Sequence, residues 1–365
     1  MVVMGITVGI PTTITIIKKK SNLMSRKLIL CLAALFIPLH SAFAGPVVFH
    51  DRKELEAIME DLIAWWPGTW DSFPQIYYER TVTMPKDGEH EHWHRTFAKI
   101  NAPQLGEVVF YGQINVEGRD GAILGRSQAL YKVSIDEARG VVSMSGQPIA
   151  DPDNFENLHE RPELWGKVRM MDESAIMCDF VWRREGDQLV GVVDSKVPER
   201  RKNGPGTCSY LSPRTNEEFM SDAEWVLTPE KLWLYDINTM AGMIFIGRED
   251  RTHTKLYRAR PYACEVQDAQ GKRTINAHDR GYEAELTAKS GRKAELLLLR
   301  ADYPAADGFG LDDRLRLMLV DSASKKPIAT TDLPPLSKSI KASAEGVNIE
   351  CKFTDKFASL ARANP

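Results

Sequence analysis

The sequence predicts a mainly β protein, in which an antiparallel β-barrel follows one N-terminal helix and a smaller β-rich region follows the barrel. Short runs rich in Val, Ile, Tyr, Phe and Trp recur from residue 75 onward. Turn sequences such as Lys86-Asp87-Gly88 and Glu185-Gly186-Asp187 separate these runs. A single layer of about ten strands would leave two exposed edges, so we expect the layer to close into a barrel.

One amphipathic helix is expected before the strands. Apolar residues recur there at steps of three and four, namely Leu55, Ile58, Met59, Leu62, Ile63 and Trp66. Asp51 followed by Glu54 resembles a capping box at the helix start, with Asp in place of Ser or Thr. Pro67-Gly68 is a stop signal for a helix.

The expected strands then follow one another along the chain. For the barrel they are 75–84, 90–100, 107–116, 126–135, 140–145, 175–183, 189–195, 223–227, 231–238, 243–247 and 255–262, and beyond it 281–288, 295–303, 314–320 and 346–353. Residues 146–166 are expected as a loop or short helix over a barrel mouth, and 325–335 as a loop. The domain assignment is a barrel over 45–264 and a smaller β-rich domain over 265–365.

The N-terminus has the pattern of a secretory signal peptide. Arg26 and Lys27 precede an apolar run over 28–39, and Ala42-Phe43-Ala44 fits a cleavage site before Gly45. The run is too short to span a bilayer. We therefore assign 1–44 as a signal peptide, with 1–23 as an over-extended start, and expect an exported protein, periplasmic or secreted, without a membrane span after cleavage.

The charge of the remaining chain limits its possible partners, and its cysteine content predicts disulfides. Residues 1–44 hold five basic and no acidic side chains, so of 47 basic and 50 acidic residues 42 and 50 remain, a formal charge of −8. This acidic balance argues against a nucleic-acid partner. Four cysteines remain, which in an exported chain favours two disulfides. Three pairings are possible, and Cys178–Cys208 with Cys264–Cys351 is preferred because each pair stays within one expected domain.

Alternating residues on the expected strands suggest a ligand pocket. Tyr111 and Gln113 share one strand face, and so do Arg126 and Gln128. Cys178, Phe180 and Trp182 share a third face. If these faces point inward, the lumen suits an apolar ligand that carries carboxylates. The opposite faces, which hold Tyr131 and Val133 or Met177, Asp179 and Val181, remain alternatives, because a shift of one residue inverts every strand. An ordinary packed core is the other interpretation.

Other motifs give little evidence of a metal site or of catalysis. His90, His92 and His94 alternate and would project from one strand face, which makes them weak candidates for a metal site. Candidate third ligands are His50, His159 and Glu224, and none of them has motif spacing, so no metal site is assigned. The sequence contains no nucleophile elbow, phosphate-binding loop or Cys-x-x-Cys pair. Catalytic residues stay unassigned.

Several motifs together resemble the CpcT/CpeT-type phycobiliprotein lyases, in an exported relative of non-photosynthetic type. The resemblance covers about 52–260 and rests on the order of the motifs. They are Leu62-Ile63-Ala64-Trp65-Trp66-Pro67-Gly68-Thr69-Trp70-Asp71-Ser72, His92-Trp93-His94, Phe110-Tyr111-Gly112-Gln113, Asp151-Pro152, and the series Cys178, Gly191, Cys208-Ser209-Tyr210-Leu211, Asp222 and Glu224. Where the family strand reads Tyr-Arg-x-Arg, this chain has Gly125-Arg126-Ser127-Gln128.

The resemblance implies a calycin/lipocalin-like barrel that binds a linear tetrapyrrole (a bilin) and attaches it to a cysteine of a partner protein. In that family an arginine holds the propionates and a carboxylate stabilises the pyrrole nitrogens. The implied ligand-binding residues are Tyr111, Gln113, Arg126, Gln128, Trp182 and Glu224. We expect no required cofactor, and a small apolar anion as the ligand. The alternative function is an exported lipocalin-like carrier without catalytic activity.

Overall fold

The computed structural model describes residues 51–82, 88–123, 127–171, 178–195, 197, 206–211, 216–305 and 307–357. Helix α1 (Arg52–Trp65) opens this part of the chain, and strand β1 (Gly68–Asp71) and helix α2 (Phe73–Thr81) follow it. The N-cap prediction is confirmed, because the Asp51 carboxylate accepts a hydrogen bond from the backbone N–H of Glu54 at 2.9 Å. The expected signal peptide lies outside the described residues.

We expect the Asp51→Ala variant to lose about 1 kcal/mol of unfolding free energy, because the first helical turn loses an acceptor for its backbone N–H. Glu56→Ala is the control, since Glu56 belongs to an exposed ion pair with Arg52 on the same helix and its loss should cost well under half as much. Urea denaturation measures both. Equal losses in the two variants would show that the cap contributes nothing of its own.

Ten antiparallel strands close into a barrel, as predicted. Neighbouring strands pair from β10 through β12, β1 and onward to β7 and β9, and β9 pairs with β10 to complete the ring. The remaining strands of the ring, after β1, are β2 (Trp93–Ile100), β3 (Val108–Val116), β4 (Ala129–Asp136), β5 (Val141–Pro148), β6 (Cys178–Glu185), β7 (Gln188–Ser195), β9 (Glu218–Leu227), β10 (Lys231–Met240) and β12 (Thr254–Arg258). Strands β8 (Thr207–Leu211) and β11 (Met243–Ile246) pair only with β9 and β10.

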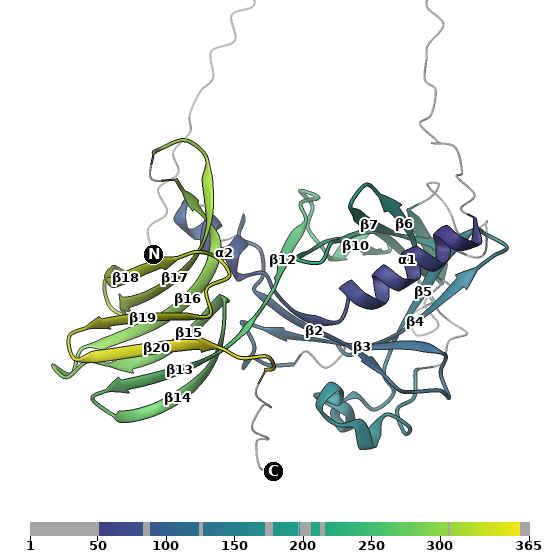
Figure 1. Cartoon of the computed structure of the whole chain (residues 1–365). Helices are drawn as coiled ribbons and strands as arrows, with labels where there is room; N and C mark the ends of the chain where they lie inside the picture. Colours follow the sequence, from purple (N-terminus) through teal and green to yellow (C-terminus); the bar gives the residue numbers. More distant parts are fainter. Residues whose placement is uncertain are drawn as a thin grey trace, which may run out of the picture. The chain divides into compact units, whose positions relative to one another are not determined.

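A single apolar core fills the barrel at the end that α1 covers. All ten strands of the ring contribute buried side chains to this core, and α1 adds Leu55, Ile58 and Leu62. Figure 1 shows α1 lying against β4, β5 and β6. Trp66 is at the centre, because its ring contacts the five rings of Phe97, Phe110, Tyr131, Trp182 and Trp225.

Glycines make room for these large rings. A Cβ on Gly112 would lie 2.8 Å from the Tyr131 ring, and a Cβ on Gly191 would lie 2.8 Å from the Trp182 ring. Real side chains do not approach so closely, so both positions need glycine for the rings to pack flat on the strands. The aromatic layer therefore depends on particular small residues opposite it.

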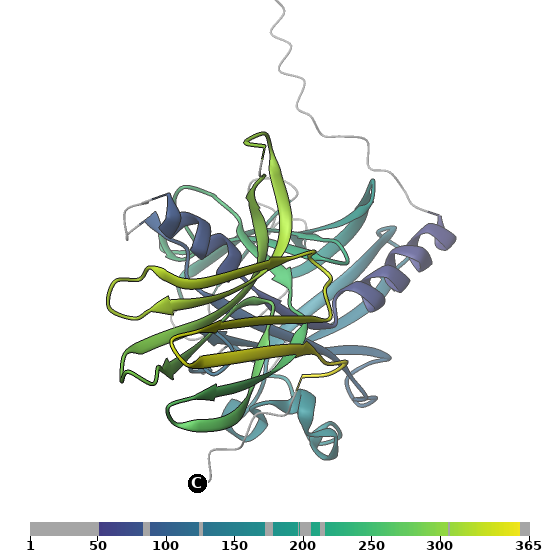
Figure 2. The same cartoon turned by 60° about the vertical axis from the view of Figure 1, so that its left-hand side comes forward.

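The C-terminal part is a sandwich of two four-stranded sheets, which Figure 2 shows in green and yellow. One sheet has β13 (Pro261–Asp268), β14 (Gly271–His278), β19 (Ser339–Ala344) and β20 (Val347–Phe353), and the other has β15 (Arg280–Thr287), β16 (Lys293–Pro304), β17 (Leu311–Asp321) and β18 (Pro327–Leu333). Both sheets supply the buried residues of one core. The β-rich class expected for this region is confirmed, while the boundary at residue 264 remains a prediction.

Both predicted disulfides are present. Cys178 is bonded to Cys208, and Cys264 is bonded to Cys351. The first pair joins β6 to β8, and the second pair joins neighbouring strands β13 and β20 of the sandwich. Two disulfides fit an oxidising compartment.

Three local expectations were wrong. The strand expected over 75–84 is helix α2 across its described part, because Pro74 stands in the first helical turn and the Asp71 carboxylate accepts the Phe73 N–H at 2.8 Å. The loop expected over 325–335 contains β18, which pairs with β17 through β-branched residues such as Thr330. The segment 146–166 covers the outer face of β3 and not a barrel mouth.

Candidate functional site

A buried arginine that forms no hydrogen bond or ion pair with the described residues faces the inside of the barrel. Arg95 on β2 lies directly opposite Trp70 of β1, whose ring belongs to the barrel core. The Arg95 side chain is 7% exposed, and its guanidinium lies over the Trp93 ring at 4.6 Å. In the described part of the chain no hydrogen bond or ion pair reaches it, and its Nε is buried and unbonded. Burial lowers the pKa of Arg95, while nearby Tyr131 and Asp236 raise it.

Other buried hydrogen-bond donors inside the barrel also lack partners among the described residues. The indole N–H groups of Trp66, Trp182 and Trp225 are buried, and none has a hydrogen-bond partner among the described residues. These three rings belong to the same core as Trp70 and Phe110. A buried donor without an acceptor costs about 1–3 kcal/mol. The barrel interior therefore presents one guanidinium and several N–H groups that an acceptor ligand would satisfy.

Beyond Trp66, the inward faces of three strands hold side chains that are not fully buried. Tyr131, Phe180 and Asp236 are only partly buried, although each lies on the inward face of its strand beside a core residue. Asp236 accepts a hydrogen bond from Asn238 Nδ2 at 2.6 Å. Burial raises the pKa of Asp236, and Arg95 and Asn238 oppose that shift. Arg95, Tyr131, Phe180, Asp236 and Trp225 thus combine aromatic walls with one cation and one carboxylate.

Three of the predicted ligand-binding residues lie together, but on the outer face of the barrel. The Tyr111 hydroxyl contacts Gln113 Oε1 at 2.6 Å and Gln128 Oε1 at 2.8 Å. Gln113 Nε2 donates to Asn157, and Gln128 Nε2 donates to the Pro152 carbonyl, so the three side chains bond to the covering segment. Burial raises the pKa of Tyr111 far above its usual value. Through these contacts, the side chains of Tyr111, Gln113 and Gln128 find their hydrogen-bond partners within the protein.

The remaining predicted ligand-binding residues are scattered. Trp182 faces the barrel core, whereas Glu224 lies on the opposite face of β9 from Trp225, with His253 Nε2 3.5 Å from its carboxylate. Arg126 lies outside the described residues, and its role stays a prediction. Of the alternative faces that the sequence left open, the one with Tyr131 and Val133 packs into the barrel core.

The histidines expected to share one strand face divide into two clusters. His90 precedes β2 and contacts Glu79, while His92 and His94 both contact Asp71, which is fully buried. His92 Nε2 lies 2.9 Å from Asp71 Oδ1, and His94 Nδ1 lies 2.8 Å from Asp71 Oδ2. His50 lies outside the described residues.

His278, at the end of β14, completes the Asp71 cluster from the C-terminal sandwich. Its Nε2 lies 3.6 Å from Asp71 Oδ2, so Asp71, His94 and His278 have the composition of a metal site. The hydrogen bonds do not fit one. The Arg280 N–H donates to His278 Nδ1 at 3.2 Å, so the proton of the neutral ring is on Nε2, the atom that a metal would need. The cluster is therefore a carboxylate that accepts several N–H groups.

The pKa shifts of Asp71 and His278 agree with a charged carboxylate that accepts hydrogen bonds from neutral histidines. Burial would raise the pKa of Asp71, but hydrogen bonds from His92 and His94 outweigh it and hold the pKa well below its usual range. Burial lowers the pKa of His278 to about 3, with Asp71 opposing the shift. A cavity of about 30 Å³ adjoins the cluster and is lined by His94, Arg119 and His159 among others. That volume holds one or two waters.

We expect acid to destabilise the protein through its buried neutral histidines. Burial lowers the pKa of His159 to about 4, and Arg119 and His94 add to the shift. Because the unfolded chain takes up this proton at about pH 6.5 and the folded chain only near pH 4, unfolding free energy falls as pH drops through that interval. Calorimetry of His159→Gln should show a shallower loss between pH 6.5 and 4. A slope equal to that of the unaltered chain would contradict this.

Sequence reasoning missed Arg95 and Asp236. The alternation of Trp93, His94 and Arg95 contained the signal, because His94 on one face of β2 requires Arg95 on the other. Which of these two faces of β2 points into the barrel became clear only from the closure of the barrel. Across the described residues, no helix is both long and apolar enough to cross a membrane. Comparison with protein-family models found no match, and comparison with curated proteins found none.

Proposed function

We propose that the barrel binds a linear tetrapyrrole, or a similar elongated apolar anion, and that the Arg95 guanidinium holds its carboxylate. The observation that supports this is a buried cation inside the barrel that has no hydrogen bond or ion pair among the described residues, with Asp236 as a nearby carboxylate that it does not contact directly. An isolated buried charge costs several kcal/mol, and a bound carboxylate offsets that cost. Arg95 takes the role that the family resemblance gave to Arg126.

The rest of the interior fits the same class of ligand. Aromatic rings of Tyr131, Phe180 and Trp225 provide flat apolar walls, and buried indole N–H groups provide donors. Asp236 is a carboxylate in the same interior and can accept hydrogen bonds from pyrrole nitrogens. A ligand with both acidic groups and N–H groups satisfies Arg95 and Asp236 together. A simple fatty acid satisfies only Arg95.

The disulfides bear on the choice between lyase and carrier. All four cysteines in the described part of the chain are oxidised, so in a lyase the thiol that receives the pigment belongs to a partner protein. The export expected from the sequence, with which the two disulfides are consistent, favours the carrier. We therefore propose an exported binding protein first, and transfer of the pigment to a partner's cysteine second.

Absorption spectroscopy with biliverdin tests both functions. Titration of the purified chain should shift and intensify the red band of the pigment and saturate at one ligand per chain. Pigment that stays on an acceptor polypeptide after denaturation would support the lyase, and pigment released from both proteins would support the carrier. A spectrum that does not change with protein concentration would contradict tetrapyrrole binding.

A further inference from the structure

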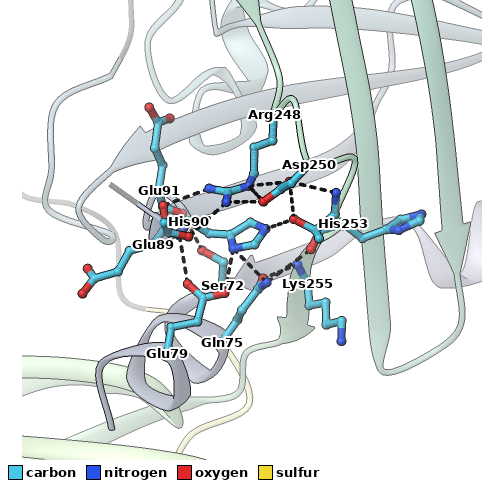
Figure 3. Close-up of polar contacts among 12 residues, drawn as sticks. Ser72, Gln75, Glu79, Glu89, His90, Glu91, Arg248, Asp250, His253 and Lys255 are labelled. Carbon is cyan, nitrogen blue, oxygen red and sulfur yellow. Dashed lines mark hydrogen bonds and ion pairs between the residues drawn. The ribbon is translucent and has the colours of Figure 1, made fainter. Parts of the chain in front are cut away.

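On the outer surface of the barrel, an imidazole lies within hydrogen-bond distance of a carboxylate on one side and of a hydroxyl on the other. Glu79 belongs to α2, His90 precedes β2, and Thr252 lies in the loop between β11 and β12. Glu79 Oε1 lies 2.6 Å from His90 Nδ1, and Thr252 Oγ1 lies 3.1 Å from His90 Nε2. Figure 3 shows His90 between Glu79 and the loop that holds Asp250. This is the order of groups in a nucleophile–base–carboxylate triad.

The hydrogen bonds define where the protons are. Glu79 is 5% exposed, and its second oxygen accepts the backbone N–H of His90 at 2.9 Å, so the carboxylate and the ring are fixed together. The short contact to Glu79 is explained by a ring proton on Nδ1, in which case the Gln75 amide donates to the His253 carbonyl and not to the ring. The Thr252 hydroxyl donates to Asp250 Oδ1 at 2.8 Å, so it must turn toward His90 Nε2, 3.1 Å away, before that nitrogen can accept its proton. This tautomer is the one that a general base requires.

Burial and charged groups from two elements act on the pKa of His90. Burial lowers the pKa of His90, and Arg248 adds to that shift, while Glu79 and Asp250 oppose it. Glu79 comes from α2, whereas Arg248 and Asp250 come from the β11–β12 loop. Gln75 is the other polar neighbour, with its Nε2 3.1 Å from His90 Nδ1.

The loop that carries the hydroxyl is held in place. Arg248 donates to the carbonyls of Gly88 and Glu89 at 3.0 Å, and it forms an ion pair with Asp250. Asp250 Oδ1 accepts the Thr252 N–H at 3.1 Å and lies 2.8 Å from Thr252 Oγ1. Thr252 is nevertheless exposed, so an external molecule can reach its oxygen. The oxygen is thus fixed, accessible and close to two acceptors for its one proton.

We propose that Glu79, His90 and Thr252 form an acyl-transfer site that hydrolyses activated carboxylic esters. Thr252 Oγ1 attacks the ester carbonyl, its proton passes to His90 Nε2, and then to the oxygen of the leaving alcohol as the carbon–oxygen bond breaks. Water then attacks the acyl-threonine and gives one proton to His90, which returns it to Thr252 Oγ1. The products are one carboxylic acid and one alcohol.

Exposure limits the substrates of this site. The oxyanion that forms on the exposed face of Thr252 points toward solvent, so it lacks the stabilisation of a closed site. Good leaving groups are needed, and esters of phenols fit this requirement better than amides. The site is remote from the barrel interior, so its activity and tetrapyrrole binding can fail independently.

The test uses p-nitrophenyl acetate with the full exported chain. We expect release of p-nitrophenol with an initial burst, and an acetyl group on the peptide that contains Thr252 in mass spectra of the quenched reaction. Thr252→Val should reduce the burst rate by about 100-fold, and His90→Gln should do the same, because general-base catalysis contributes about 10²- to 10⁴-fold. Thr252→Ser should retain the burst.

Two controls separate catalysis from a structural role. Thr228→Val removes an exposed hydroxyl in a turn, and His94→Gln alters a buried histidine that contacts a carboxylate but no hydroxyl. Both should react as the unaltered chain does. A role for Glu79 in positioning His90 predicts that Glu79→Gln lowers the rate and shifts its pH profile. Acetyl groups found only on lysines, or an unchanged burst in Thr252→Val, would overturn the proposal.

Discussion

Arg95→Leu should weaken tetrapyrrole binding by about 10- to 150-fold while leaving the fold stable. The loss corresponds to about 1.5–3 kcal/mol for a charge-assisted hydrogen bond between the guanidinium and a carboxylate. The ligand-free protein should lose little stability, because the guanidinium has no hydrogen bond or ion pair within the described residues and only its longer-range attraction to Asp236 is removed. Biliverdin titration and urea denaturation give the two quantities.

A charge on the opposite face provides the control for this variant. Arg183 on β6 is exposed, and Arg183→Leu makes the same chemical change outside the barrel. Its affinity for biliverdin should equal that of the unaltered chain. If both variants bind equally well, Arg95 does not hold the ligand. If Arg95→Leu unfolds at much lower urea, the guanidinium has a structural partner.

Trp66→Ala should have the largest effect on stability of any single substitution in the barrel, a loss of about 3–5 kcal/mol of unfolding free energy. Trp66 is 1% exposed and contacts five aromatic rings, so its removal leaves a cavity where the ten strands meet α1. The rigid strands cannot close that cavity. Denaturation in urea, monitored by circular dichroism, measures the loss.

The neighbouring tryptophan provides the comparison. Trp65 is only partly buried at the end of α1, and Trp65→Ala should lose less than half as much. Trp66→Phe keeps a ring at the centre and should recover most of the stability. An equal loss for Trp65→Ala and Trp66→Ala would mean that the helix end, and not the ring at the centre, stabilises the barrel.

Much of the fold followed from local patterns in the sequence. The α1 stripe predicted the buried Leu55, Ile58 and Leu62, and the run of strands predicted closure. The cysteine pairing was also predicted correctly, and the structure places Cys264 with Cys351 in the sandwich, on strands β13 and β20. Helix α2 could not be predicted from residue preferences, because Ile76, Tyr77 and Tyr78 favour strands and the helix depends on Pro74 and on the Asp71 cap.

The site was less predictable because it depends on which face of each strand points inward. Tyr111 and Phe110 are adjacent, and only the ring closure shows that Phe110 enters the barrel while Tyr111 meets the covering segment. Arg95 faces inward because its register partner Trp70 does. Asp71 and His94 are register partners on the neighbouring strands β1 and β2, but no spacing in the sequence reveals that His278 joins them from β14.

Nuclear magnetic resonance of the tryptophan side chains tests directly whether the ligand binds inside the barrel. Indole N–H signals of Trp66, Trp182 and Trp225 should shift when the chain is saturated with biliverdin, because their unbonded N–H groups would lie beside a ligand in the barrel interior. The signal of Trp165, whose indole N–H donates to the Leu158 carbonyl in the segment that covers the outer face of the barrel, should stay in place. If only surface indoles respond, or none does at saturation, the pigment does not bind inside the barrel.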